Sequence, residues 1–347
     1  MDIDLGRLTV AVAFLLAGLP GVKLGAAENT SPQDVVTLSA AEGTRTLKGR
    51  ILNYSGSGLK IELSGGLEKS IPANAVVDVQ LANPSTAQRA ARLAVQAGQF
   101  EKALQGYRRL LDSGKEKRPW VQRKILAEMI ECQQALGRHE QAAGTFIELL
   151  EEDPTTPYFA KIPLAWTATD QINPEKSSRW LESEHPAVRL LGASYLLTTR
   201  RDRALGFLKS LMENPAQNIS ALATAQWLRT RVPQASSKEI LLARTTLERL
   251  APALRGGPYY VLGQLYAAQG EHRRAAIAMM HVPILFPQRQ QLAAESLLTA
   301  GKSMVTSGLP AAAVRVYQEL LESYPKSMAA LEAKQRQQKL INQLKDS

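Results

Sequence analysis

The sequence predicts a mainly α-helical protein, an α-α superhelix that follows a small all-β module. Three observations support this fold class: alanine and leucine dominate from about residue 85 onward, a glycine-centred motif recurs along that part, and residues 35–82 instead show short β-rich segments between glycines. The chain has 347 residues, of which 45% are hydrophobic, so more than one module is expected.

The N-terminal residues have the pattern of an export signal. Residues 8–19 form a mostly apolar run, and Gly25, Ala26 and Ala27 supply small residues before the next acidic side chain. We therefore expect residues 1–27 to be a signal peptide and 28–34 a linker, which leaves no transmembrane span in the mature chain. The run is shorter than the about 20 apolar residues of a membrane-spanning helix. A retained N-terminal anchor and a cytosolic leader remain as alternatives.

Residues 35–82 predict a small module of half-buried strands. The predicted strands are residues 35–38, 46–52, 59–63 and 76–79. Alternation at Leu59, Ile61 and Leu63 places three apolar side chains on one strand face. Glycine-rich separators, such as residues 55–58, fit tight hairpins. The order of these segments resembles small barrels of the Sm-like or SH3-like type.

A repeated motif is the strongest signal in the chain. In each of four copies, a glycine lies five residues before an alanine, a large side chain follows four residues after that alanine, and an aliphatic side chain follows seven after it. The glycines are Gly98, Gly137, Gly270 and Gly308, and the alanines are Ala103, Ala142, Ala275 and Ala313. Such a glycine can end one helix in a left-handed conformation, and the alanine allows close approach of two helices. A weaker fifth copy surrounds Ala204.

This pattern resembles the tetratricopeptide repeat (TPR), a helix-turn-helix that stacks into a superhelix. We assign residues 83–325 to TPR-like helical repeats, with degenerate helix pairs at 155–183 and 216–256, and residues 326–347 to a polar capping helix. The family's tryptophan is missing from every copy, and the glycine spacings of 39 and 38 residues exceed the family's period. An irregular superhelix is therefore expected. Gly270 and Gly308 should have positive φ, and Ala275 and Ala313 should be buried at helix contacts.

No catalytic, cofactor-binding or metal-binding residues are predicted. The Gly-Lys-Ser tripeptide at residues 301–303 has Ser296 where a phosphate-binding loop needs a glycine, five residues before Gly301, and it lies within a predicted helix. The histidines lack a second ligand at helical spacing, and His139 and His272 occupy equivalent turn positions, where we expect them to be exposed. Cys132 is the single cysteine and should be a buried helix residue. The chain is therefore predicted not to be an enzyme and to need no cofactor.

The function expected from the resemblance is that of an exported, non-catalytic scaffold that binds a protein or peptide partner in the cell envelope, in envelope assembly or maintenance. In the family, the first helix of each pair lines a concave groove. By this analogy, the groove residues are Gln88, Arg92, Lys124, Arg189, Tyr260, Gln264, Leu298 and Lys302. Their character is basic with an apolar patch, which suits an acidic partner.

Two alternative functions remain, one suggested by the net charge and one by a short motif. The formal net charge is +10, and residues from 83 onward carry an excess of eleven basic side chains, so nucleic-acid or anionic-surface binding is the runner-up. The absence of a recognition motif and the few aromatic residues argue against it. Glu295 and Ser296 resemble a pair in lytic transglycosylases, which leaves a cell-wall-acting enzyme as a weaker alternative. The sequence does not give the partner's identity, the oligomeric state or the role of the β-module.

Overall fold

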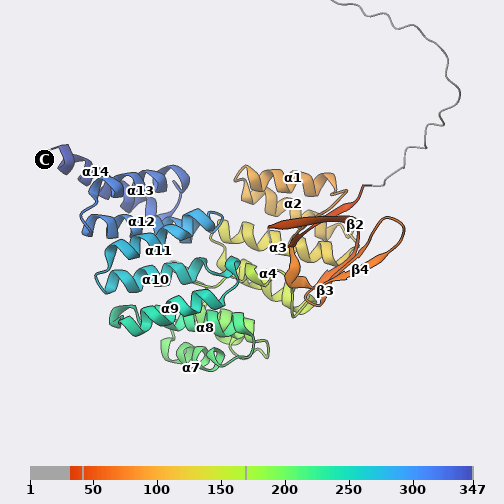
Figure 1. The fold of residues 1–347 in the computed structure, drawn as a ribbon, viewed down its shortest axis with the longest axis horizontal. Coiled ribbons are helices and arrows are strands. Elements are labelled where there is room, and N and C mark those ends of the chain that lie inside the picture. The colour runs from red at the N-terminus through yellow and green to blue at the C-terminus, as the bar shows by residue number, and fades with distance from the viewer. Residues whose placement is uncertain (1–31, 41–42, 169, 346–347) are drawn as a thin grey trace, which may run out of the picture.

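The computed structural model of the chain describes residues 32–40, 43–168 and 170–345. The predicted signal peptide and most of the linker lie outside these residues. Figure 1 shows the β-strands beside helices α1–α4 (residues 86–152) at one end, while α7–α14 (residues 201–345) form a stack on the other side. We call α1–α4 the N-terminal arm and α10–α14 (residues 256–345) the C-terminal arm.

The β-module is a five-stranded antiparallel sheet with the order β4-β3-β2-β1-β5. Its elements are β1 (Asp34–Ser39), β2 (Thr44–Ser55), β3 (Gly58–Glu62), β4 (Glu68–Ile71), the 3-10 turn η1 (Ala73–Ala75) and β5 (Val76–Gln80). Val36 and Ile61 are completely buried. Strand β4 is an addition to the four predicted strands, because only Ile71 in it is apolar and buried, and a single apolar residue gives no alternation to detect.

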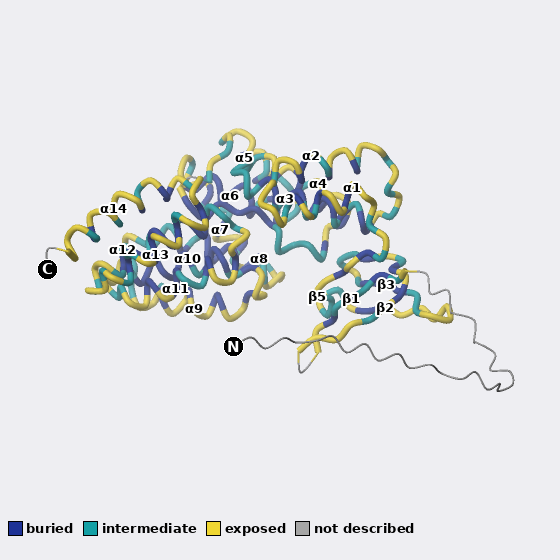
Figure 2. The backbone as a smooth tube through the Cα atoms, turned by 90° about the horizontal axis from the view of Figure 1, so that it is seen from above, coloured by how far each residue is buried: buried dark blue, intermediate teal, exposed yellow. Residues whose placement is uncertain are grey.

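The rest of the chain is helical and consists mostly of consecutive antiparallel pairs. The helices are α1 (Thr86–Gln96), α2 (Phe100–Asp112), α3 (Pro119–Ala135), α4 (His139–Glu152), α5 (Pro174–Trp180), α6 (Pro186–Leu196), α7 (Arg201–Met212), α8 (Gln217–Arg229), α9 (Ser237–Arg249), α10 (Gly256–Ala268), α11 (His272–Leu285), α12 (Gln290–Thr306), α13 (Pro310–Ser323) and α14 (Met328–Lys345). Short 3-10 turns are η2 (Phe159–Lys161), η3 (Val232–Gln234) and η4 (Pro252–Leu254). The pairs are α1/α2, α3/α4, α6/α7, α8/α9, α10/α11 and α12/α13, and α14 packs last on α13 and α12. In Figure 2, buried backbone follows the contacts between these helices.

The repeat motif has the predicted physical role. Gly270 and Gly308 have φ of 76° and 77° and follow the first helix of their pairs, and Ala275 and Ala313 are completely buried. Both predictions are confirmed. The two helices of a pair also approach closely at Gly301, where an added Cβ would lie 2.3 Å from a ring carbon of Tyr317.

Residues 155–183 differ from the expected helix pair. Among the described residues of this range, only η2 and the short helix α5 form, and the chain from Ile162 to Thr167 is buried without regular secondary structure. Pro157 and Pro163 restrict the residues before them to extended conformations, and Pro163 lacks the N–H that a continuing helix needs. The apolar residues that looked like helix faces instead fill the interior of the superhelix.

The β-module is docked on the N-terminal arm through buried polar contacts. Arg123 of α3 donates from Nη2 to the backbone oxygen of Tyr54 at 2.8 Å, and the backbone N–H of Gly56 donates to Asp153 Oδ2 at 2.9 Å. A Cβ at Gly56 would lie 2.1 Å from the backbone oxygen of Thr155, so only glycine fits there. The two modules therefore share a specific, closely packed interface.

Candidate partner-binding site

Residues 157–168, which we call the inner segment, run between the two arms. Lys161 forms an ion pair with Glu131 of α3, while the backbone oxygen of Ala160 accepts a hydrogen bond from Arg289 Nη2, next to α12, at 3.1 Å. Since Ala160 and Arg289 are 129 residues apart in sequence, the inner segment links the N-terminal arm to the C-terminal arm.

Side chains from the first helices of successive pairs hold the backbone of the inner segment. Tyr195 of α6 donates its hydroxyl to the backbone oxygen of Pro163 at 2.7 Å. In α8, Gln226 Nε2 and Arg229 Nη1 both donate to the backbone oxygen of Ala165, at 2.9 and 2.6 Å. Burial lowers the pKa of Arg229 to about 10, and the nearby carboxylate of Asp170 opposes this shift. These polar groups are thus directed into the interior and are satisfied there by the chain's own carbonyl groups.

A carboxylate closes the C-terminal end of the inner segment. Asp170 Oδ2 accepts hydrogen bonds from the backbone N–H groups of Trp166 and Thr167, at 2.7 and 2.9 Å. Its other oxygen lies 3.5 Å from His139 Nε2, at the start of α4. The His139 side chain is only 13% exposed, so the expectation of an exposed turn histidine is wrong for this residue. Asp170 could not be singled out from the sequence, because its partner His139 comes from a different part of the fold.

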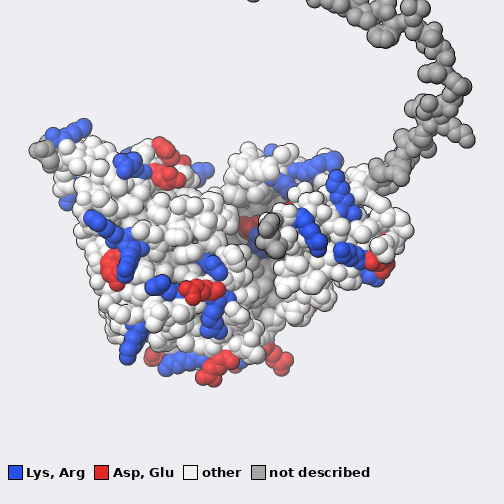
Figure 3. Space-filling model, viewed as in Figure 1, with Lys and Arg blue, Asp and Glu red and all other residues white. Residues whose placement is uncertain are grey.

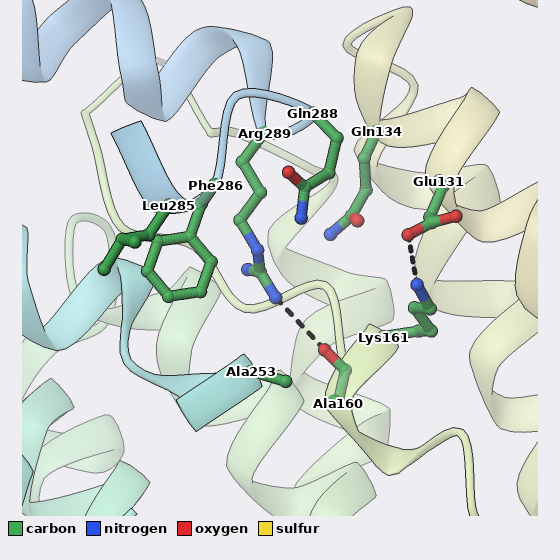
Figure 4. Close-up of a pocket in the computed structure, with 9 residues that line it drawn as sticks. All are labelled: Glu131, Gln134, Ala160, Lys161, Ala253, Leu285, Phe286, Gln288 and Arg289. Carbon is green, nitrogen blue, oxygen red and sulfur yellow. Dashed lines mark hydrogen bonds and ion pairs between the residues drawn. The ribbon is translucent and has the colours of Figure 1, made fainter. Parts of the chain in front are cut away.

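A pocket of about 190 Å³ opens beside the inner segment, where the two arms meet. We call it the mouth pocket. Its walls come from α3, the inner segment, η4, the last residue of α11 and the loop between α11 and α12. The lining residues are Glu131, Gln134, Ala160, Lys161, Ala253, Leu285, Phe286, Gln288 and Arg289. In Figure 4, the side chains of Arg289, Gln288 and Gln134 approach one another, and Leu285 and Phe286 lie on the opposite side from the Glu131–Lys161 pair.

Arg289 dominates the electrostatics of the mouth pocket. Burial lowers the pKa of its guanidinium, with Glu131 and Asp170 acting in the opposite direction. Among the described residues, no carboxylate oxygen lies within 4.0 Å of this guanidinium, and its hydrogen bond goes to a neutral carbonyl. With Lys161 and Glu131 neutralising each other, the pocket keeps one positive charge that has no direct counter-ion.

The remaining charges are distributed over the surface. Figure 3 shows a hollow between the two arms, and outside it Lys and Arg side chains are interspersed with Asp and Glu. Among the described residues, no group of three or more His, Cys, Asp and Glu side chains is arranged to hold a metal ion. None of the described helices is both long and apolar enough to cross a bilayer.

The eight groove residues predicted from the sequence do not form one open surface. Gln88, Tyr260 and Leu298 are buried, at 1%, 6% and 3% exposure, and so are inaccessible in the folded chain. Gln264 and Arg189 are partly exposed, and the Nε of Arg189 is a buried donor that finds no hydrogen-bond acceptor in the described part of the chain.

The three other basic groove residues are neutralised by acids that the sequence analysis did not assign to this face. Arg92 pairs with Glu128 at 3.1 Å, and Lys302 pairs with Glu332 at 2.8 Å. Lys124 Nζ lies 3.8 Å from Asp78 and 3.7 Å from Glu128. Contact of these side chains with a partner stays a prediction, whereas Arg289, Lys161 and Gln134 are candidates that only the folded structure brings together.

Comparison with known proteins supports the repeat assignment at its C-terminal end. A family model of the tetratricopeptide repeat matches residues 295–327, which include most of the α12/α13 pair. No curated protein sequence matches the chain significantly.

Two solved structures are similar at low sequence identity. One is described as the TPR2AB domain and pHSP90 complex of yeast Sti1, with 13% identity and a TM-score of 0.30, covering 73% of this chain and 96% of that chain. The other is the assembly chaperone of RpL4 (Acl4, residues 1–338), with 13% identity and a TM-score of 0.33, covering 76% of this chain and 97% of that chain.

Proposed function

We propose that this protein is a non-catalytic scaffold that binds a protein partner at the opening between its two arms, and that the mouth pocket receives an acidic side chain of that partner. The observation that carries this proposal is Arg289, a half-buried guanidinium that lines the pocket and has no directly paired carboxylate among the described residues. A charge that is partly removed from water and has no ionic partner is unfavourable, so a carboxylate from outside gains more here than at a fully exposed cation.

The size of the mouth pocket supports an anchor for one side chain. Its volume of about 190 Å³ is below the roughly 300–1,000 Å³ of sites that enclose a small-molecule ligand. Leu285 and Phe286 provide an apolar wall for the methylene groups of a Glu or Asp side chain, and the amides of Gln134 and Gln288 supply further donors. This favours recognition of a polypeptide over turnover of a substrate.

The proposal includes export to the cell envelope, with a role in envelope assembly or maintenance. Its support is the apolar run at residues 8–19 followed by small residues. It also includes the likeness of the β-module to Sm-like or SH3-like barrels, which is supported by its five antiparallel strands in one small sheet. The runner-up, nucleic-acid binding, is disfavoured because the basic residues Arg92, Lys124 and Lys302 are already paired with acids.

The test is crosslinking of the full-length protein in the native envelope, followed by quantitative capture. Arg289→Gln removes the charge but keeps an amide in the pocket, and Arg315→Gln removes an exposed charge from α13 as a matched control. We expect the first variant to lose partner capture by about tenfold or more and the second to retain it. Equal capture by both variants would refute the mouth pocket as the site.

Two further double variants separate the competing surfaces. Arg189→Glu with Lys302→Glu tests the groove that the sequence predicted, and Arg45→Glu with Lys48→Glu tests exposed charges of the β-module. Loss of capture only in the β-module variant would move the binding site there. Binding of all variants to random single-stranded DNA, with a steep loss on adding salt, would instead favour the nucleic-acid alternative.

A further inference from the structure

The middle of the inner segment, residues 162–166, runs through the superhelix without turns, as an extended peptide would. It follows one short 3-10 turn, Phe159–Lys161. Ile162, Leu164 and Trp166 are only 1%, 5% and 5% exposed. The interior of the superhelix is therefore filled by a segment of the chain itself, in the place where a bound peptide would lie.

The surrounding side chains recognise the backbone of this segment. The carbonyl oxygens of Ala160, Pro163 and Ala165 accept hydrogen bonds from Arg289, Tyr195 and the Gln226/Arg229 pair, respectively. Each donor lies on or beside the first helix of a different helix pair. Because carbonyl groups are common to all sequences, this set of donors fits any extended polypeptide of suitable side-chain size.

One side chain of the segment occupies a site of specific shape. The indole of Trp166 lies against the start of α10, where a Cβ on Gly257 would come within 2.0 Å of two of its ring carbons. The slot is open only because residue 257 has no side chain. A large buried aromatic ring contributes much of the affinity in peptide recognition, so Trp166 is the main anchor of the segment.

The buried hydrogen-bond donors would lose an acceptor if the inner segment left and no other polypeptide took its place. Gln226 is completely buried, and burial disfavours the charge of Arg229, so removing the carbonyl of Ala165 without replacement would leave two buried groups without this acceptor. If a second polypeptide replaces the inner segment, its carbonyl groups can accept these hydrogen bonds. If the interior is left empty, the donors stay unsatisfied.

We propose that the inner segment is a displaceable ligand held in cis, and that the inner face of α6, α8 and α10 binds in its place an extended partner segment with apolar side chains and a tryptophan. This rests on the proposed function in one respect, that the partner is a polypeptide. The mouth pocket adjoins the same segment at Ala160 and Lys161, so a partner anchored there by an acidic side chain is placed next to the segment it displaces.

The test uses the full-length chain and a fluorescein-labelled synthetic peptide of residues 157–168, with binding measured by fluorescence anisotropy. Trp166→Ala removes the main anchor in cis, so the peptide should bind this variant with an apparent Kd at least about tenfold lower than that of the unaltered chain. Trp227→Ala removes a partly buried tryptophan elsewhere and serves as the control, with no gain in peptide binding. A peptide carrying the same Trp166→Ala change should not bind any of the proteins.

Amide hydrogen exchange of the unaltered chain provides a second readout that does not depend on a variant folding. A displaceable segment should expose the amides of Ala165, Trp166 and Thr167 through a local opening, while α6 and α8 stay protected. The proposal is overturned if these amides exchange only together with α6 and α8, or if a folded Trp166→Ala protein fails to bind the peptide. Neither result bears on capture at Arg289, so failure of the proposed function is recognised separately.

Discussion

Replacing a glycine by alanine should have opposite effects on stability at a helix contact and on an open helix surface. Gly301→Ala places a Cβ within 2.3 Å of the buried Tyr317 ring, and overpacking of this kind costs about 1–3 kcal/mol. Gly144→Ala, on α4, meets nothing within 4 Å and should stabilise the helix by about 0.5–1 kcal/mol. Chemical denaturation of both variants checks this, and a shift of the same sign in both would contradict the packing of α12 on α13.

The buried alanines of the motif tolerate no charge. Ala313→Glu introduces a larger, ionised side chain at a completely buried position, so the free energy of unfolding should fall by several kcal/mol, on the order of 3. Ala311→Glu, on the exposed face of the same helix, should change it by less than about 0.5 kcal/mol. Urea denaturation gives both values. A loss below about 0.5 kcal/mol for Ala313→Glu would show that the register of the repeat is wrong.

Docking of the β-module on the helices depends on a few buried polar groups. Arg123→Ala removes the donor to the backbone oxygen of Tyr54 and the cation that lies 4.0 Å from Asp153. It leaves buried acceptors unsatisfied, at a cost of about 1–3 kcal/mol. We expect faster amide exchange in β2 and β3 of this variant, while α10–α13 remain protected. Lys115→Ala, at an exposed position between α2 and α3, is the control and should leave exchange unchanged. Unchanged exchange in Arg123→Ala would mean that apolar contacts alone hold the module.

The many buried tyrosines make the folded chain sensitive to alkali. Burial raises the pKa of Tyr54 and of Tyr260 from 10.0 to about 12, and that of Cys132 from 9.0 to about 12. The folded state therefore keeps protons that the unfolded state releases. This stabilisation is fully present below the unfolded pKa values, declines as the pH rises above about 9 to 10, and is lost through about pH 12. Arg229 and Arg289, whose pKa values burial lowers, act in the opposite direction but are fewer than the buried phenols whose pKa is raised.

Thermal unfolding followed at pH 8, 9, 10 and 11 measures this dependence. Stability should fall steadily with pH over the upper part of this range. Tyr158→Phe is the informative variant, because burial raises the pKa of Tyr158 and its buried hydroxyl has no hydrogen-bond partner among the residues that the structure describes. It should flatten the fall and cost little at pH 8. A flat profile of the unaltered chain up to pH 11 would contradict the burial of these phenols.

Much of the fold could be predicted because the signals are local. A helix pair shows its glycine, its small contact residue and its large core residues within one repeat, and Gly270, Gly308, Ala275 and Ala313 have the conformation and burial expected of them. Strands with alternating apolar residues, such as β3, were detectable for the same reason. Strand β4 was missed since it gains its hydrogen bonds from β3 and has little pattern of its own.

The candidate site, in contrast, was decided by tertiary structure. Residues 157–168 have an apolar composition that is equally compatible with a divergent helix pair, and the prolines exclude regular helix without saying where the chain goes. The donors that hold this segment come from 32, 61, 64 and 129 residues away. Likewise, charges that define a basic groove in the sequence are neutralised by acids on other elements. Repeat periodicity specifies which faces of neighbouring helices pack together, but the content of the interior depends on the curvature of the complete superhelix, which brings α12 back to α3.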